Sequence, residues 1–421
     1  MILREQFDVS EDRGFLPEYD PAINFFAHNR ARIKAFPRSD GVGTACYVLT
    51  NDCKQIPKLL ATGQFRNFVN SLPQDRYLNI SGVGHKDLSG DVDNEMRLAM
   101  NLLSFMAHAY LWGGDEPTPI LPYVIAVPWH AVAKKIGRPP IQSYVSYAID
   151  NWYRVDKTKG ITLDNISLIQ NFLGGVDEEW FTMIHVVMEA QAGGALAGAY
   201  YACEAAKTED WAEVEKGLFK VAHSLGRVYN TFCRMEEKCD PYIYYNRVRP
   251  YIFGTMNNPN LPNGLIYEGV EEYNGAPQKF RGETGAQSSI IPALDGVLGI
   301  DHKGTIGDNK EEDVLKTYLM EMREYMPPKH RAFIEWCEEN GNLRKHLKKR
   351  KSMTIPYNLC IGWMEAFRTK HMEFANTYIV QQSQSSAKVG HGGSTLYGTG
   401  GTPFMKYLKK HRDETTHTKV E

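Results

Sequence analysis

The chain has 421 residues, with 48 lysines and arginines against 50 aspartates and glutamates, so its formal net charge is −2. This balance gives no electrostatic reason to expect a nucleic acid or an anionic membrane as partner. A composition that is 43% hydrophobic and 23% charged excludes a largely disordered chain. At about 150 residues per domain the length suggests two or three domains, and we favour two.

The cysteines and the uncharged stretches indicate a soluble, cytoplasmic protein. The seven cysteines are scattered and form no Cys-x-x-Cys pair, so we expect free thiols in a reducing compartment. A charge at Arg4 interrupts the apolar start of the sequence, so we expect no secretory signal there. Two long uncharged stretches, 117–133 and 389–405, are shorter than the roughly 20 residues that span a bilayer.

The first 167 residues have a mixed pattern. Strand-like apolar runs at Ala45–Leu49 and Tyr123–Val127 stand beside a helical stretch at Val92–Trp112. We expect residues 1–167 to form a small α-rich domain.

From about Leu168 the pattern changes to long amphipathic helices, which predicts a large all-α domain over residues 168–421. The segment Ser383–Thr402 is rich in Ser, Gly and Gln, and we expect a mobile loop there. The helices predicted in this half are Glu178–Ala206, Trp211–Lys238, Glu311–Tyr325, Pro328–Asn340, Pro356–Gln382 and Phe404–Lys410.

Several familiar motifs are missing from the sequence. The stretch Gly398–Thr402 is not followed by Lys-Ser/Thr, and it does not lie in a βαβ pattern, so it supports neither a P-loop nor a dinucleotide fingerprint. No His-Glu-x-x-His and no Gly-x-Ser-x-Gly occurs. The basic run Arg344–Lys351 is interrupted by leucines at helical spacing, which favours a solvated helix face over a nucleic-acid contact.

Two predicted helices each carry an inward histidine. His371 shares an apolar stripe with Phe367 and Phe374, and His185 shares a face with Phe181. A lone inward histidine is most often a buried, hydrogen-bonded core residue. Two such histidines on separate helices are also what a haem pocket with proximal and distal sides requires.

Two further segments leave alternatives open. The small residues 190–198 favour tight helix packing, although they would also admit a flat cofactor. The segment Pro241–Arg249 combines aromatic and guanidinium groups, which suit either an inter-helix surface or a pocket that binds a carboxylate.

At this point the sequence resembles the indoleamine 2,3-dioxygenase family over most of its length. The resemblance depends on several segments together, which are Ile125–Pro128, Arg138–Ile141, Pro262–Gly269, Gly282–Ser289, Asp295, Leu298–Ile300, Tyr325–Arg331, Phe367–His371 and Gly398–Thr402. The resemblance implies a two-domain, almost wholly α-helical protein with b-type haem between the domains.

On the proximal side, the resemblance implies that His371 is the haem-iron ligand. Gly285 would lie beside the cofactor, and Arg368 and Asp295 match a pair that links the proximal helix to its neighbour. The alternative for that pair is an ordinary buried ion pair.

On the distal side, the resemblance implies a substrate pocket closed by a lid at Gly398–Thr402. Arg249 matches the group that holds the substrate carboxylate, and Thr399 matches the hydrogen-bonding member of the lid. The residues expected to bind substrate are Tyr144, Phe181, Tyr244, Arg249, Thr284 and Thr399.

Three positions depart from the mammalian members. His185 stands where those enzymes have Ser, Tyr244 where they have Phe, and Glu283-Thr284 replaces a Gly-Ser pair. His185 looks more like the distal histidine of tryptophan 2,3-dioxygenases, which hydrogen-bonds the indole N–H, and we expect it to be catalytic.

The implied reaction is cleavage of the indole C2–C3 bond of L-tryptophan, or a close indoleamine, by O2 to give N-formylkynurenine in tryptophan catabolism. The implied cofactor is haem b, ferrous in the active form. One alternative is a haem monooxygenase of an indole or tryptophan derivative, and another is a non-catalytic haem-binding protein. A third alternative is a haem-free helical protein in which His371 is a core residue.

Overall fold

The computed structural model describes residues 2–21, 42–82, 91–302, 311–385, 398–400 and 404–420. Within these ranges the regular structure is almost entirely helical, which confirms the all-α prediction. The four strands are only two or three residues long, and they are β1 (Ile120–Leu121), β2 (Trp152–Arg154), β3 (Ile166–Leu168) and β4 (Ile266–Tyr267).

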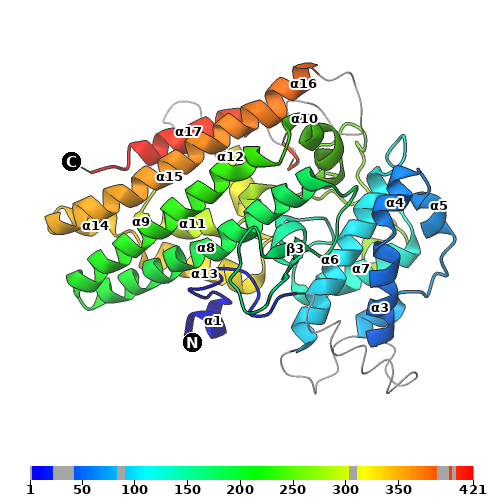
Figure 1. Ribbon diagram of the computed structural model, residues 1–421, viewed down its shortest axis with the longest axis horizontal. Helices are drawn as coiled ribbons and strands as arrows, with labels where there is room; N and C mark the ends of the chain where they lie inside the picture. Colours follow the sequence, from blue (N-terminus) through cyan, green and yellow to red (C-terminus); the bar gives the residue numbers. More distant parts are fainter. Residues whose placement is uncertain are drawn as a thin grey trace.

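The first part of the chain forms a cluster of shorter helices around α6. This cluster lies at one end of the molecule in Figure 1. Its α-helices are α3 (Val42–Cys53), α4 (Ile56–Ala61), α5 (Phe65–Asn70), α6 (Asp91–Trp112) and α7 (Tyr123–Ile136), and a π-helical turn, η2 (Val145–Ile149), follows them.

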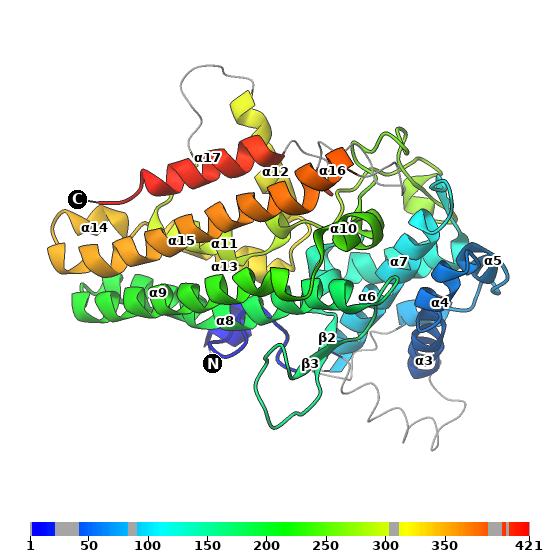
Figure 2. The same ribbon diagram turned by 45° about the horizontal axis from the view of Figure 1, so that its top comes forward.

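The second part is built on long helices, and α8, α9, α15 and α17 run alongside one another in both views (Figures 1 and 2). The long helices are α8 (Val176–Lys207), α9 (Trp211–Cys233), α15 (Thr354–Ala375) and α17 (Phe404–Thr416). The shorter ones are α10 (Pro241–Ile243), α11 (Ile290–Leu298), α12 (Glu311–Arg323), α13 (Pro328–Asn340), α14 (Arg344–Leu347) and α16 (Gln381–Ser385), with single turns η4 (Tyr244–Val248), η5 (Arg249–Ile252), η7 (Gly285–Gln287) and η9 (Asn376–Val380).

The glycines of α8 serve close packing, as one of the two interpretations of residues 190–198 expected. A Cβ atom added at Gly198 would lie 2.9 Å from the carbonyl oxygen of Gly217 on α9. A Cβ atom added at Gly193 would lie 2.6 Å from the backbone nitrogen of Gly14. Larger side chains would therefore push α8 away from both neighbours.

The two strand-like runs of the first part are helical, so those predictions were wrong. Ala45–Leu49 lies inside α3, and Tyr123–Val127 forms the start of α7. A short apolar run looks the same in a buried strand and in a buried helix, and both segments continue into longer helical patterns. Pro122, with an extended ψ of 152°, sets the start of α7.

The predicted long helices are present with small shifts at their ends. Pro328–Asn340 matches α13, whereas α17 extends beyond the predicted Phe404–Lys410 to Thr416. The predicted helix Pro356–Gln382 contains a π-helical turn, η9, between α15 and α16. Of the loop predicted at Ser383–Thr402, residues 383–385 are helical, residues 398–400 form a turn, and the rest lies outside the described residues.

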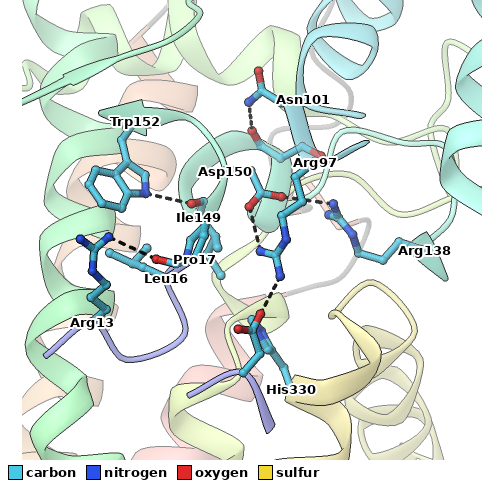
Figure 3. A network of polar contacts seen from close by, with 12 residues as sticks. Arg13, Leu16, Pro17, Arg97, Asn101, Arg138, Ile149, Asp150, Trp152 and His330 are labelled. Atoms are coloured by element: carbon cyan, nitrogen blue, oxygen red, sulfur yellow. Dashed lines mark hydrogen bonds and ion pairs between the residues drawn. The ribbon is translucent and has the colours of Figure 1, made fainter. Parts of the chain in front are cut away.

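A polar network holds the η2 turn in place (Figure 3). The carboxylate of Asp150, directly after η2, lies 3.2 Å from Nη1 of Arg97 on α6 and 3.5 Å from Nη2 of Arg138. Asn101 on α6 donates to the carbonyl of Ser146 at 2.6 Å. These contacts anchor the turn that presents Tyr144 and Tyr147 to the second part of the chain.

One hydrophobic core runs through both parts, from Leu3 to Tyr378. The N-terminal α1 (Ile2–Phe7) contacts α13, with ring centroids of Phe7 and Phe333 5.3 Å apart. β1 pairs in parallel with β4, which joins segments from the two parts. The division at residue 167 remains a prediction. None of the helices in the described ranges combines the length and apolar character that a membrane crossing needs.

Candidate active site

Two histidines from the long helices lie close to each other in the interior. His185 is on α8 and His371 is on α15, and the two rings are near enough that a proton on His185 would lower the pKa of His371. Protein surrounds both side chains, yet each keeps part of its surface accessible, which indicates that they border an internal space. The structure therefore brings together the two histidines that the sequence singled out.

Both imidazoles are held in the neutral form. Burial, together with nearby His185, lowers the pKa of His371 to about 4. Burial also lowers the pKa of His185. No hydrogen bond joins the ring nitrogens of His371 to another residue in the described ranges, so a nitrogen lone pair is available for a metal ion.

Aromatic rings enclose this space on the side of His371. Phe232 of α9 has its ring centroid 6.2 Å from the His371 ring, 4.8 Å from Phe367 and 4.9 Å from Phe374. The stripe predicted on this helix therefore packs against α9, and it holds His371 on a rigid apolar surface.

A second aromatic wall lies around His185. The Phe181 ring is 4.6 Å from the His185 ring and 4.7 Å from the Tyr244 ring. Tyr144, next to the η2 turn, lies edge-on to His185 at 5.8 Å. The segments that carry Tyr144 and Tyr244 thus meet Phe181 on one face of α8, although the three residues are far apart in the sequence.

Arg249 is buried beside this wall, with only 2% of its surface exposed. Its guanidinium lies 4.6 Å from the ring centroid of Phe253 and 5.3 Å from that of Tyr245. Burial lowers the pKa of Arg249, whose ordinary value is so high that the group stays charged. A buried guanidinium stacked on aromatic rings is pre-organised to bind a carboxylate.

Backbone hydrogen bonds tie the segment of Arg249 to two other segments of the site. The N–H of Glu283 donates to the carbonyl of Ile252 at 3.0 Å, and the N–H of Gly254 donates to the carbonyl of Thr399 at 3.3 Å. The Thr399 hydroxyl donates to the carbonyl of Glu283. The described part of the expected lid, residues 398–400, therefore lies against the segments that carry Arg249 and Glu283; Thr402 lies outside the described residues.

Two other predicted residues, Thr284 and Gly285, follow Glu283 and lie at the edge of the site. The Thr284 hydroxyl accepts a hydrogen bond from the N–H of Ala286 and so caps the η7 turn. Gly285 is exposed, and a Cβ atom added there would meet no atom within 4 Å. The roles expected for Thr284 and Gly285 toward substrate and cofactor remain predictions.

The predicted pair behind His371 is present. Arg368, one turn before His371 on α15, donates to both carboxylate oxygens of Asp295 on α11, at 2.9 and 2.7 Å. His302 lies between the carboxylates of Asp295 and Glu414, at 3.0 and 2.7 Å. This network joins α11, α15 and α17, and it fixes the helix that carries His371.

The group His302, His411 and Glu414 has the composition of a metal site, with its ligand atoms within 4.8 Å of one another. The cationic Arg368 and Lys410 adjoin it, at 3.4 Å from His302 and 3.9 Å from Glu414. The arrangement is therefore that of an ion-pair network rather than of a site for a cation.

Two buried carboxyls belong to the site and were not predicted as functional. Glu189, one turn after His185, accepts hydrogen bonds from the hydroxyls of Tyr144 and Ser288 at 2.9 and 2.8 Å. Burial raises the pKa of Glu189 to about 7 and that of Glu283 to about 8. Glu189 lies one turn after His185 on the same helix face, and this spacing was the signal in the sequence that could have identified it.

A separate cavity of about 370 Å³ lies on the other side of α8, between that helix, α9 and the loops at 11–12 and 160–162. Its lining residues on α8, Ala190, Gln191 and Gly194, face away from Phe181 and His185. This cavity is therefore not part of the site.

The neutral, hydrogen-bond-free imidazole of His371 fits a haem-iron ligand. Imidazole nitrogen is a common axial ligand of haem, and the aromatic residues around it provide an apolar surface for a flat macrocycle. The other histidine, His185, would then lie on the distal side.

Comparisons with known proteins agree with this geometry. The sequence model of the family described as Indoleamine 2,3-dioxygenase matches residues 3–418. The chain is 33% identical to indoleamine 2,3-dioxygenase 1 of Rattus norvegicus over 371 residues, covering 86% of each chain. It is also 33% identical to the indoleamine 2,3-dioxygenase of Saccharomyces cerevisiae, covering 80% of this chain and 82% of the yeast protein.

A more distant relative carries a different name. A protein named myoglobin, from Haliotis madaka, is 28% identical over 373 residues, which covers 86% of this chain and 89% of that protein. The match to the family model nevertheless extends over nearly the whole chain and includes every residue of the site. The chain therefore belongs to the indoleamine 2,3-dioxygenase family.

Proposed function

We propose that this chain is a haem-dependent dioxygenase that inserts both atoms of O2 across the indole C2–C3 bond of L-tryptophan, or a close indoleamine, to give N-formylkynurenine. The observation that carries the proposal is the pair of neutral imidazoles on α8 and α15, with an aromatic wall and a buried guanidinium on the His185 side. Family membership supports the same activity.

His371 would hold the iron of haem b through its free ring nitrogen. Haem iron, ferrous in the active form, supplies the O2 chemistry that no side chain provides. Arg368 and Asp295 hold the helix of His371 against α11, which keeps the imidazole in a fixed orientation.

On the distal side, Arg249 binds the substrate carboxylate, while Phe181 and Tyr244 enclose the indole ring. Nδ1 of His185 is 2.8 Å from the carbonyl oxygen of Phe181, so this nitrogen carries the proton and Nε2 presents a lone pair. That lone pair accepts the hydrogen bond of the indole N–H. Thr399 and its loop close the pocket against water.

The relative named myoglobin supports a second candidate, a haem protein that binds O2 without turning over an organic substrate. Arg249 favours the enzyme, because a buried guanidinium stacked on aromatic rings offers a site for the carboxylate of an amino-acid substrate.

The two candidates differ in a simple assay. The haem-loaded, reduced protein is given L-tryptophan and air, and formation of N-formylkynurenine is followed by chromatography. The enzyme forms many equivalents of product per haem, whereas reversible O2 binding without product would contradict the proposal. His371→Ala serves as the control, since it removes the expected iron ligand and must abolish the haem spectrum of the wild type.

We further propose that the chain acts in tryptophan catabolism and in the cytoplasm. The seven cysteines are all free thiols, and six of them are buried, which suits a reducing compartment.

A further inference from the structure

The carboxyl group of Glu283 is buried without a partner. Its side chain is in a residue only 4% exposed, and no hydrogen bond or ion pair joins its oxygens to another described residue. Burial raises the pKa of Glu283 to about 8, and no cation among the described residues lowers it. A buried carboxyl without compensation destabilises the fold, so its presence points to a role that a bound molecule completes.

The backbone places Glu283 at the same end of the pocket as Arg249 and Thr399. Its N–H is bonded to Ile252, three residues after Arg249, and its carbonyl accepts the hydroxyl of Thr399. The segments also touch directly, because a Cβ atom added at Gly282 would lie 2.2 Å from the backbone nitrogen of Gly254. The backbone of Glu283 is therefore held at a fixed place against the segment that carries Arg249.

The charge of the Glu283 carboxylate affects the pKa of three tyrosines of the distal pocket. Burial raises the pKa of each of Tyr144, Tyr147 and Tyr244, and the Glu283 carboxylate raises each of them further. These tyrosines come from the η2 region and from η4. The Glu283 carboxylate thus acts on Tyr144 and Tyr244, two of the residues that form the aromatic wall around His185.

We propose that Glu283 binds the α-ammonium group of the substrate and makes this chain select amino acids with a free amino group. Arg249 and Glu283 then offer opposite charges to the two ends of an amino-acid zwitterion, while the aromatic wall takes the ring. A bound ammonium group compensates the buried carboxylate and keeps it ionised. This inference rests on the proposed function.

The test compares equilibrium dissociation constants of the haem-loaded full chain for three ligands, measured by calorimetry. L-Tryptophan carries both charges, tryptamine carries only the ammonium, and indole-3-propionate carries only the carboxylate. Glu283→Gln keeps the size of the side chain and removes its charge. We expect it to weaken L-tryptophan and tryptamine about 10- to 100-fold, as loss of a charge-assisted hydrogen bond does, and to leave indole-3-propionate unchanged or tighter.

Arg249→Gln is the complementary variant, and it must weaken L-tryptophan and indole-3-propionate but not tryptamine. Glu189→Gln is the matched control, because Glu189 is also a buried carboxyl of the site but is already bonded to Tyr144 and Ser288. Glu189→Gln must change the dissociation constants of tryptamine and indole-3-propionate by the same factor. The Soret spectrum and the thermal midpoint of each variant show that haem and fold are retained.

Equal weakening of all three ligands by Glu283→Gln would overturn the inference, since the side chain would then only shape the pocket. Loss of haem affinity in Glu283→Gln, with unchanged selectivity among the ligands, would also overturn it, because the carboxyl would then serve the cofactor. If the wild-type protein forms product from L-tryptophan, but Glu283→Gln discriminates among the three ligands as the wild type does, only this inference fails. If the wild type binds none of the three ligands, the proposed function fails.

Discussion

Nδ1 of His185 lies 2.8 Å from the carbonyl oxygen of Phe181, one turn earlier on α8. A carbonyl oxygen only accepts hydrogen bonds, so this contact fixes the proton on Nδ1 and leaves Nε2 as an acceptor. Burial lowers the pKa of His185, and a neutral ring keeps that acceptor available. The structure thus leaves Nε2 of His185 as a hydrogen-bond acceptor, which is what the proposed contact with the indole N–H requires.

Replacing His185 by Ala should therefore lower the turnover of L-tryptophan. We expect a loss of about 100-fold in kcat, at the low end of the range for a positioned acid–base group. The measurement is steady-state kinetics of the haem-loaded variant. 1-Methyltryptophan, which has no indole N–H, provides the control, because the wild type should prefer L-tryptophan and His185→Ala should lose most of that preference. An unchanged preference would contradict the role of His185.

Replacing Arg249 by Ala should mainly raise KM for L-tryptophan. In the proposed function the guanidinium binds a carboxylate that does not react, so its loss should remove binding common to the ground and transition states. We expect an increase of about 10- to 100-fold in KM, as for loss of a charge-assisted hydrogen-bond pair. Arg247→Ala is the matched control, because Arg247 is an exposed arginine two residues earlier. An unchanged KM in Arg249→Ala would contradict the carboxylate role.

Replacing Asp295 by Asn should destabilise the protein. The change leaves Arg368 buried without its carboxylate, and the loss of one partner of a buried pair costs about 3 to 5 kcal/mol. Denaturant unfolding of the haem-loaded chain measures this loss. Glu272→Gln breaks the exposed pair with Lys134 and should leave stability almost unchanged. If both substitutions changed the free energy of unfolding equally, the pair of Asp295 and Arg368 would contribute no more to stability than an exposed pair.

Stability should fall at alkaline pH because of His302. Burial by itself lowers the pKa of His302, but the carboxylates of Asp295 and Glu414 outweigh burial and raise it to about 9. Because this folded value lies above the ordinary value of about 6.5, the protonated ring stabilises the fold fully below pH 6.5, and the contribution is lost as the pH rises through 9. The charged Arg368 and Lys410 and the neutral His411 also face this network.

The measurement for His302 is the denaturant midpoint between pH 6 and pH 10. The wild type should lose stability over the upper part of this range, and His302→Gln should lose much less there. A parallel loss in both proteins would place the effect on other groups.

The sequence predicted the long helices, and the inward positions of two histidines on them, better than the first part of the chain. Phe181, His185 and His371 recur at helical spacing with apolar neighbours, and such periodicity survives into the fold because burial enforces it. The strand predictions at 45–49 and 123–127 were wrong because a short buried run has no period that separates helix from strand.

The partners of the site residues could not be predicted from spacing. Glu189 meets Tyr144 and Ser288 only after three segments far apart in the chain are packed together. The contact of Thr399 with Glu283 joins residues 116 positions apart, and it depends on the close approach of Gly254 and Gly282. Such contacts depend on tertiary packing, which no local pattern records.

The most direct test of the proposed activity is mass spectrometry of the product formed from L-tryptophan under isotopically labelled O2. The haem-loaded, reduced protein should give N-formylkynurenine that carries two labelled oxygen atoms, because both atoms of O2 enter the cleaved bond. A product with one labelled oxygen would indicate a monooxygenase, and the absence of product from a protein with an intact haem spectrum would contradict the enzyme altogether.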